Sequence, residues 1–243
     1  MNPGLKLQLF LSHSGVCSRR KALDLILDGH VTVNAQVMQE PSLIINPEKD
    51  KISLDGKLIQ QKTYTYLLLN KPRGFVTTLK DKHAQKTVLD LLPQDLRYLR
   101  PAGRLDKDTE GLLLLTNDGD LIYKLTHPKF NIDKTYFVQI NGELKATEKK
   151  QLETGVKIDG KITSPAKIFD IKIKGKKSEF QIVIHEGRKR QIRRMLDCIG
   201  HKVVYLKRIE QGQLRLGDLA IGKWRYLSEK EVSLLKDKSF VDK

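Results

Sequence analysis

The sequence predicts an α+β fold with a small N-terminal module over residues 1–60 and a mixed, mainly antiparallel sheet domain over residues 61–243. Two observations predict this division. Helical periodicity marks the first stretch, whereas strand patterns interrupted by helices mark the rest. The polar residues 60–63 separate the two patterns and are typical of a linker. A chain of 243 residues is long enough to bury the core that such a sheet needs.

The N-terminal module is expected to contain two short helices followed by short strands. Gly15 is of the type that ends a helix in a left-handed cap. Ser18 is a typical N-cap for the second helix, which Gly29 ends. The expected helices cover residues 5–14 and 19–28, and the expected strands cover residues 31–33 and 52–54.

The second domain is expected to consist mainly of strands. The expected strands cover residues 66–70, 135–140, 167–173 and 179–185, with a turn at 175–178 joining the last two. The expected helices cover residues 118–125, 147–155 and 191–199. The leucines of 112–115 indicate a buried backbone directly behind the charged run 103–111.

The charge of the chain indicates a polyanionic partner, because its net charge is +16 and its pI is near 9.7. Residues 1–60 hold seven Lys and Arg against six Asp and Glu, and residues 61–243 hold 38 against 23. Scattered lysines would serve only solubility. However, five of the seven residues 188–194 are cationic, and such clustering favours a binding surface.

Several classes of protein are disfavoured. No apolar run is long enough for a membrane span and the N-terminus has no signal pattern, so we expect a cytoplasmic protein with no membrane partner. Cys17 and Cys198 lack the spacing of a zinc site or a disulfide framework. Neither a complete Gly-x-x-x-x-Gly-Lys-Ser/Thr loop nor a Gly-x-Gly-x-x-Gly fingerprint occurs, so no nucleotide cofactor is expected.

The run 103–111 is the densest candidate site, with three carboxylates and two cations. Carboxylates at alternate positions before Gly111 match half of a calcium loop, but Asn117 stands where the final glutamate is required, so no metal is expected. Asp106 and Asp108 could form the carboxylate pair of a glycoside hydrolase, although nothing in the sequence places them across a bond.

A third interpretation makes a single ionised Asp106 the nucleophile that attacks a nucleoside. An adjacent guanidinium would keep the carboxylate charged and fix its direction. The candidates are Arg104 in the same run and Arg193 in the distant basic helix. Alternatively, Asp106 pairs with Arg104 only to hold the loop, and residue spacing alone leaves both interpretations open.

Motifs across nearly the whole chain resemble those of RNA pseudouridine synthases, in the ribosomal small-subunit/large-subunit branch. The first is Gly103-Arg104-Leu105-Asp106 with Asp108-Thr109, Gly111-Leu112-Leu113 and Thr116-Asn117-Asp118-Gly119. The others are Leu69-Asn70-Lys71-Pro72-Arg73-Gly74, Lys134-Thr135-Tyr136, Glu186-Gly187-Arg188, Gln191-Ile192-Arg193-Arg194-Met195, and Leu206 through Arg208 with Gly212. Residues 5–50 resemble the alpha-L RNA-binding module, through Ser14-Gly15, Ser18-Arg19-Arg20-Lys21 and Gly29-His30-Val31-Thr32-Val33-Asn34.

The resemblance implies isomerisation of uridine to pseudouridine, without a cofactor. It implies that Asp106 is the essential aspartate and that Arg193 is the basic residue that pairs with it. It also implies that Tyr136 stacks on the base and takes a proton from C5, and that Leu206 forms a wall of the pocket.

The charged motifs give the expected RNA contacts. Lys71, Arg73 and Arg104 are expected to bind the substrate together with Leu206. In the first turn of the second helix, cations oppose the helix dipole, so either solvent exposure or phosphate contact must explain them. The residues expected to bind RNA are Lys6, Arg19, Arg20, Lys21, Arg188, Arg190 and Arg194.

The expected partner is ribosomal RNA, and a monomer would suffice for the reaction. The opening Leu7-Gln8 and the helix start Ser18-Arg19-Arg20 resemble those of the large-subunit enzymes of the family and so favour large-subunit RNA. The alternatives are a synthase that acts on small-subunit RNA and a noncatalytic ribosome-assembly factor built on a synthase scaffold.

Overall fold

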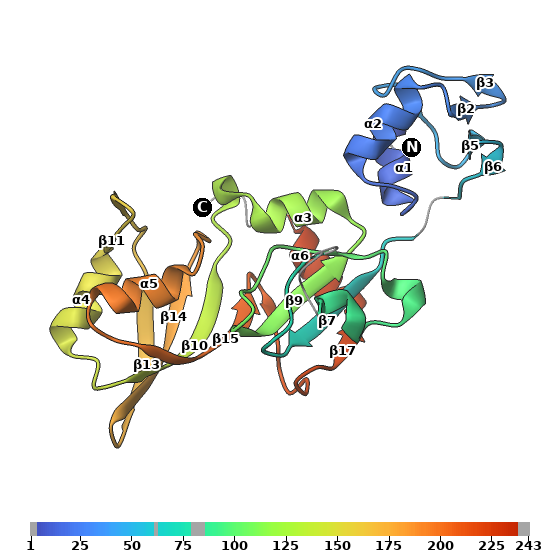
Figure 1. The fold of residues 1–243 in the computed structure, drawn as a ribbon. Helices are drawn as coiled ribbons and strands as arrows, with labels where there is room; N and C mark the ends of the chain where they lie inside the picture. The colour runs from blue at the N-terminus through green and yellow to red at the C-terminus, as the bar shows by residue number, and fades with distance from the viewer. Residues whose placement is uncertain (1–3, 61–62, 79–85, 238–243) are drawn as a thin grey trace. The chain divides into compact units, whose positions relative to one another are not determined.

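A computed structural model describes residues 4–60, 63–78 and 86–237 (Figure 1). The chain forms two compact units, Met1–Thr65 with Asn117–Gly119, and Tyr66–Thr116 with Asp120–Lys243. We call them the N-terminal unit and the sheet unit, and each is described by itself. The expected linker, residues 60–63, falls inside the first unit, shortly before Thr65, and two of its residues, 61 and 62, lie outside the described ranges.

The N-terminal unit contains two helices and short strands. The helices are α1 (Leu7–His13) and α2 (Arg19–Leu27), and Ser18 caps α2 as expected, because its hydroxyl accepts a hydrogen bond from the Lys21 amide at 3.2 Å. One small sheet has the order β3-β2-β5-β6, with bounds Gln36–Val37, Val31–Val33, Ile52–Leu54 and Lys57–Leu58. Helix α1 begins later than expected, because β1 (Leu5–Lys6) instead pairs with β4 (Ile44–Ile45).

The sheet unit is built on one large sheet, with the order β13-β14-β10-β15-β9-β7-β17 (Figure 1). These strands are Lys167–Lys174, Lys177–Ile184, Lys134–Asn141, Val203–Gln211, Glu110–Thr116, Tyr66–Lys71 and Trp224–Tyr226. In addition, β16 (Leu214–Arg215) pairs with β15, and β8 (Arg100–Pro101) pairs with β9. Among the described strands of this sheet only β9 and β15 pair in parallel, so the predicted mixed, mainly antiparallel sheet is confirmed.

Helices cover both faces of this sheet. Helices α4 (Ala146–Thr154) and α5 (Gln191–Cys198) share one apolar core with the 3-10 helices η1 (Val88–Leu91) and η2 (Gln94–Leu96). Helices α3 (Gly119–Thr126) and α6 (Glu229–Lys236) contribute to the core on the other face, near η3 (Pro128–Phe130). A separate hairpin joins β11 (Lys157–Ile158) to β12 (Lys161–Ile162).

Strands β7 and β9 are buried on both faces, because their side chains alternate between the two cores. Leu113 and Leu115 pack in one core, whereas Leu112 and Leu114 pack in the other. The leucine run is therefore a central strand, and the charged run before it leads directly out of the interior of the sheet.

The parallel contact between β9 and β15 requires a glycine at position 111. Gly111 pairs with Arg208 and has φ +105, where a side chain is strained. A Cβ at this position would lie 2.2 Å from the Arg208 carbonyl oxygen. This oxygen belongs to the backbone of β15, so it cannot move aside as the end of a flexible side chain could. Close approach of the two strands thus brings the end of the charged run against β15.

We expect Gly111→Ala to destabilise the protein much more than Gly200→Ala. Gly200 also has a positive φ of +84, but nothing lies within 4 Å of the position that a Cβ would take there, so its substitution should cost only the backbone strain, about 1–2 kcal/mol. Gly111→Ala adds the collision with Arg208. Urea unfolding of both variants measures the difference, and equal losses would show that the two strands can separate freely.

Candidate active site

One pocket of about 300 Å³ lies in the sheet unit, at the end of the charged run. Its walls come from five parts of the chain: the run 103–109, residues 125–128 at the end of α3, strand β10, the segment 184–192 that leads into α5, and strand β15. The residues used below that line it are Arg104, Asp106, Thr109, Lys134, Tyr136, His185, Arg188, Lys189, Arg190, Leu206, Arg208 and Gln211.

Asp106 lies on a short turn whose backbone is held by buried groups. The Thr109 amide donates to the Asp106 carbonyl at 3.0 Å. The preceding residue, Leu105, is buried, and the Thr77 hydroxyl bonds both its carbonyl (2.9 Å) and its amide (3.2 Å). No described residue forms a hydrogen bond or ion pair with the Asp106 carboxylate, which borders the pocket. The turn is fixed while its carboxylate remains available.

The buried side chain of Lys71 binds the backbone of this turn. Its side chain is fully buried, and its ammonium donates to the carbonyls of Thr109 (2.8 Å), Asp106 (3.1 Å) and Pro72 (3.1 Å). Burial lowers the pKa of Lys71 to about 8, against the opposing influence of nearby carboxylates, Asp106 first among them. Lys71 was expected to bind the substrate directly. In this structure its ammonium is enclosed by backbone carbonyls and Lys71 is not among the residues that line the pocket, so direct binding stays a prediction.

Asp108, and not Asp106, pairs with the arginines of the basic segment. Arg190 forms a bidentate pair with the Asp108 carboxylate at 2.9 and 3.0 Å. Arg193 lies 3.2 Å from the same carboxylate and donates to the Asp108 carbonyl at 2.9 Å. Burial alone would raise the pKa of the Asp108 carboxyl, but the Arg190 hydrogen bond and the Arg193 charge outweigh it and lower the pKa.

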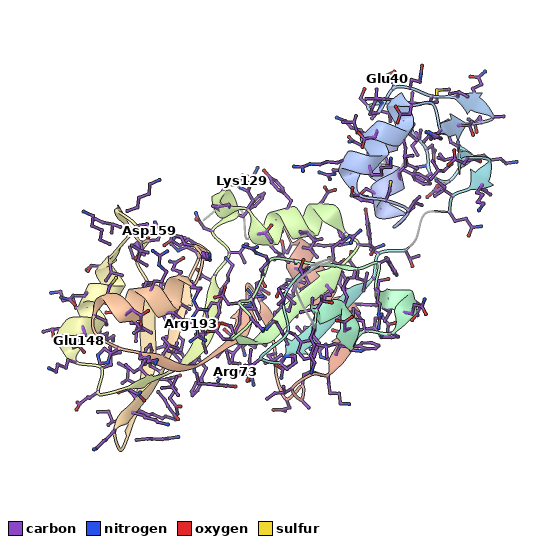
Figure 2. The ribbon with its side chains drawn as sticks, viewed as in Figure 1. Glu40, Arg73, Lys129, Glu148, Asp159 and Arg193 are labelled. Atoms are coloured by element: carbon purple, nitrogen blue, oxygen red, sulfur yellow. The ribbon has the colours of Figure 1, made fainter. Side chains whose placement is uncertain are left out.

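The expected pairing of Arg193 with Asp106 is therefore not present. Arg193 belongs to α5 and is buried. Figure 2 labels it at the lower edge of this helix. Its contact with Asp108 ties the start of α5 to the charged run, only two residues beyond Asp106. Arg193 thus reaches the expected loop but bonds a different carboxylate of it.

Tyr136 and Leu206 lie on neighbouring strands that form the floor of the pocket. In the register of β10 with β15, Tyr136 pairs with Arg208 and Val138 pairs with Leu206. Tyr136 is 8% exposed and Leu206 is 4% exposed. A flat ring and an aliphatic side chain in this position suit a planar base.

The two other arginines expected to bind substrate differ in their surroundings. Arg104 is exposed at the pocket and forms no hydrogen bond or ion pair with a described residue. Arg73 is outside the pocket lining and pairs with Glu110 at 3.2 Å while its guanidinium covers the Tyr205 ring at 4.7 Å. Arg73 therefore supports the start of β9, whereas Arg104 is free to contact a ligand.

Comparisons with known proteins identify the family of this chain. A model described as RNA pseudouridylate synthase matches residues 65–197, more than half of the chain. The chain belongs to the RNA pseudouridylate synthase family. A model of the S4 domain matches residues 5–61. The expected enzyme class and the expected RNA-binding module are both confirmed.

Individual relatives cover nearly the whole synthase. It is 42% identical over 233 residues to ribosomal large subunit pseudouridine synthase B of Bacillus subtilis, with 95% of each chain covered. It is 38% identical over 232 residues to an uncharacterized RNA pseudouridine synthase of Aquifex aeolicus, covering 95% of this chain and 93% of that protein. A crystal structure of a pseudouridylate synthase is 31% identical, with a TM-score of 0.67 over 95% of this chain and 99% of that chain.

The cations that were expected to bind RNA fall into two groups. In the N-terminal unit of the synthase, all four are exposed: Lys6, Arg19, Arg20 and Lys21. In the sheet unit, Arg188 donates to Glu186 and to the carbonyls of β12, Arg190 binds Asp108, and Arg194 binds Asp159. These three guanidinium groups are occupied by the protein itself, so their role in RNA binding stays a prediction.

Several lining residues of the synthase were not expected from the sequence. They are Thr109, Lys134, His185, Lys189, Arg208 and Gln211. Lys189 is exposed and, like Arg104, forms no hydrogen bond or ion pair with a described residue. Burial, together with the nearby charge of Arg208, lowers the pKa of Lys134 to about 8. Lys189 belongs to the basic run 188–194 and Lys134 belongs to the Lys-Thr-Tyr motif, so the sequence contained a signal for both. Strand β15, which carries Arg208 and Gln211, was not expected.

The described residues contain no group of three or more His, Cys, Asp or Glu that could hold a metal ion, and no helix among them could cross a membrane. Residues 155–161 have the Gly-x-x-x-x-Gly-Lys spacing of a phosphate loop, followed by Ile162 in place of Ser or Thr. They form the β11–β12 hairpin and not a loop that opens a helix.

The lowered pKa of Lys71 predicts a dependence of stability on pH. Between the folded pKa of about 8 and the ordinary value of 10.5, the unfolded synthase keeps the proton and the folded synthase releases it. Raising the pH across this range therefore favours the folded state, by up to about 1.4 kcal/mol per pH unit. The free energy of unfolding of the wild type, minus that of Lys71→Met, should rise over this range in urea titrations, and a flat difference would refute the shift.

Proposed function

We propose that this synthase isomerises a uridine of large-subunit ribosomal RNA, with Asp106 as the catalytic carboxylate. The observation that supports this most strongly is the unpaired Asp106 carboxylate at the same pocket as Tyr136 and Leu206. Chemistry on one nucleotide requires that its base leave the stack and enter a closed site. A pocket of about 300 Å³ with an aromatic and aliphatic floor suits one extruded pyrimidine nucleotide.

The reaction moves one bond of the nucleoside and leaves its composition unchanged. The C1′–N1 bond breaks, the uracil turns, and a bond forms between C1′ and C5. C5 loses its proton and N1 gains one, so neither an oxidant nor a phosphoryl donor is needed. We assign Asp106 to the breaking bond, and we assign Tyr136 to stacking on the base and to accepting the C5 proton.

The arginines around Asp106 have separate roles in this proposal. Arg193 and Asp108 keep the charged run attached to α5, so we treat Arg193 as a residue that positions the Asp106 turn. Arg104 and Lys189 are exposed at the pocket and have no partner among the described residues. They are suited to the phosphates that flank the extruded nucleotide, because phosphate contacts position RNA without reading its sequence.

The N-terminal unit supplies a second contact with RNA in this proposal. The first turn of α2 carries three exposed cations, Arg19, Arg20 and Lys21. Cations alone at this end of a helix oppose its dipole, whereas a bound phosphate would be favoured by both the cations and the positive end of the dipole. Binding of a phosphate therefore accounts for a sequence that is otherwise unfavourable.

The choice of ribosomal subunit rests on a relative. The Bacillus subtilis protein that is 42% identical to this chain is named for the large ribosomal subunit. Incubation with unmodified transcripts of large- and small-subunit ribosomal RNA, followed by carbodiimide mapping, tests the assignment. We expect a pseudouridine in the large-subunit transcript only, and a product confined to the small-subunit transcript would reverse the choice.

Asp106→Asn should abolish pseudouridine formation, by roughly 10³-fold or more, because the variant lacks the reacting carboxylate. Its affinity for RNA should change little. Asp108→Asn is the matched control in the same loop, and it should lower the rate by roughly 10- to 100-fold, since it only loosens the positioning of the turn. Single-turnover rates and filter binding measure both effects. Full activity of Asp106→Asn would contradict the assignment.

Arg19→Glu combined with Arg20→Glu should weaken RNA binding and reduce the dependence of log Kd on log salt by about 2, because two phosphate contacts are lost. Lys49→Glu with Lys51→Glu is the matched control, since these exposed lysines belong to the same unit but lie outside α2. Binding titrations at several salt concentrations give both slopes. An unchanged slope in the arginine variant would mean that α2 does not contact phosphate.

A further inference from the structure

Two buried polar groups at the floor of the pocket lack a hydrogen-bond partner among the described residues. They are Nη2 of Arg208 and Oε1 of Gln211. Each of the two residues is only 2% exposed, and each lines the pocket. A buried polar atom without a partner is unfavourable, so two of them in one pocket indicate a ligand that supplies the missing bonds.

The protein fixes the orientation of both side chains. Arg208 Nε donates to the Leu112 carbonyl at 2.8 Å, which holds the guanidinium and leaves Nη2 unpaired. Gln211 Nε2 donates to the Leu125 carbonyl at 3.4 Å, so the amide nitrogen is used and the amide oxygen is the free group. Two residues that line the pocket thus each carry one fixed group without a partner among the described residues, a donor on Arg208 and an acceptor on Gln211.

Both groups lie beside the residues proposed to hold the base. In the register of β10 with β15, Arg208 pairs with Tyr136, and Gln211 pairs with Lys134. The Lys134 ammonium is occupied by the carbonyls of Ile132 (3.1 Å) and His185 (2.8 Å). It adds positive charge next to Arg208 without offering an acceptor.

We propose that Arg208 and Gln211 read the edge of the uracil, with Gln211 accepting from N3–H and Arg208 donating to an adjacent carbonyl oxygen. Uracil presents a donor at N3 between two carbonyl acceptors, which complements this pair. Cytosine presents an acceptor at N3 and a donor at C4, which leaves Gln211 Oε1 facing a lone pair. The site would thus select uridine over cytidine before any bond breaks. This inference rests on the proposed function.

A chemical double-mutant cycle tests the contact between Gln211 and N3–H. Large-subunit ribosomal RNA carrying either uridine or 3-methyluridine at the modified position is converted by the wild type and by Gln211→Met, which keeps the length of the side chain but has no acceptor. Gln139→Met is the matched control, because Gln139 lies on β10 outside the pocket. Nucleoside chromatography measures kcat/KM for both substrates.

The wild type should prefer uridine by about 10- to 100-fold, the scale of one well-formed base contact. Gln211→Met should reduce this preference severalfold, and Gln139→Met should preserve it. Gln211→Glu, which retains an acceptor, should keep more of the preference than Gln211→Met. If Gln211→Met melts at a lower temperature and loses activity on both substrates, Gln211→Glu and Gln211→Ala are compared in the same way.

An unchanged preference in every Gln211 variant would overturn the inference, and would be the result if the subsite held a phosphate oxygen instead. Failure of the wild type to convert either RNA would instead contradict the proposed function. The two failures are therefore distinguishable.

Discussion

A charged group inside the sheet determines where the Asp106 carboxylate lies. The Lys71 ammonium has lost its water and is surrounded by backbone carbonyls of the turn that carries Asp106. Because β7 is buried on both faces, Lys71 cannot turn outward without leaving the sheet. The side chain that holds the turn is therefore itself fixed on a central strand. Positioning of this kind limits the motion of the Asp106 carboxylate, and a group that is held in the required geometry reacts faster than a mobile one.

The cations of the chain are divided between structure and binding. Arg190 and Arg193 neutralise Asp108, and Arg188 is bound to carbonyls and to Glu186. A surplus of positive charge thus does not identify which cations meet the RNA. The unpaired Arg104 at the pocket is a better candidate than the crowded basic segment, because a guanidinium with two protein acceptors must give them up before it can bind phosphate.

Much of the fold followed from local sequence signals, whereas the site followed only in part. The Ser18 cap is local, so it could be recognised from neighbouring residues. Strand β15 could not be recognised in this way, because its inward positions 208 and 211 are occupied by Arg208 and Gln211, which are polar and interrupt the apolar alternation. Motif spacing pointed to Asp106, but whether an arginine meets Asp106 or Asp108 depends on the approach of α5 to the loop, which sequence periodicity does not specify.

The parallel contact of β9 with β15 also constrains when the pocket can exist during synthesis. Strand β15 contributes the floor, and β17 then pairs with β7 to complete that edge of the sheet. Gly111 lies 97 positions before its partner Arg208, and Leu69 lies 155 positions before its partner Trp224, so the nascent chain emerges from the ribosome with its buried lysine and leucines still lacking their cover. The chain consequently passes through an interval in which an unfinished sheet edge is open to wrong pairing, and the Asp106 carboxylate gains its surroundings only after β15 has been synthesised.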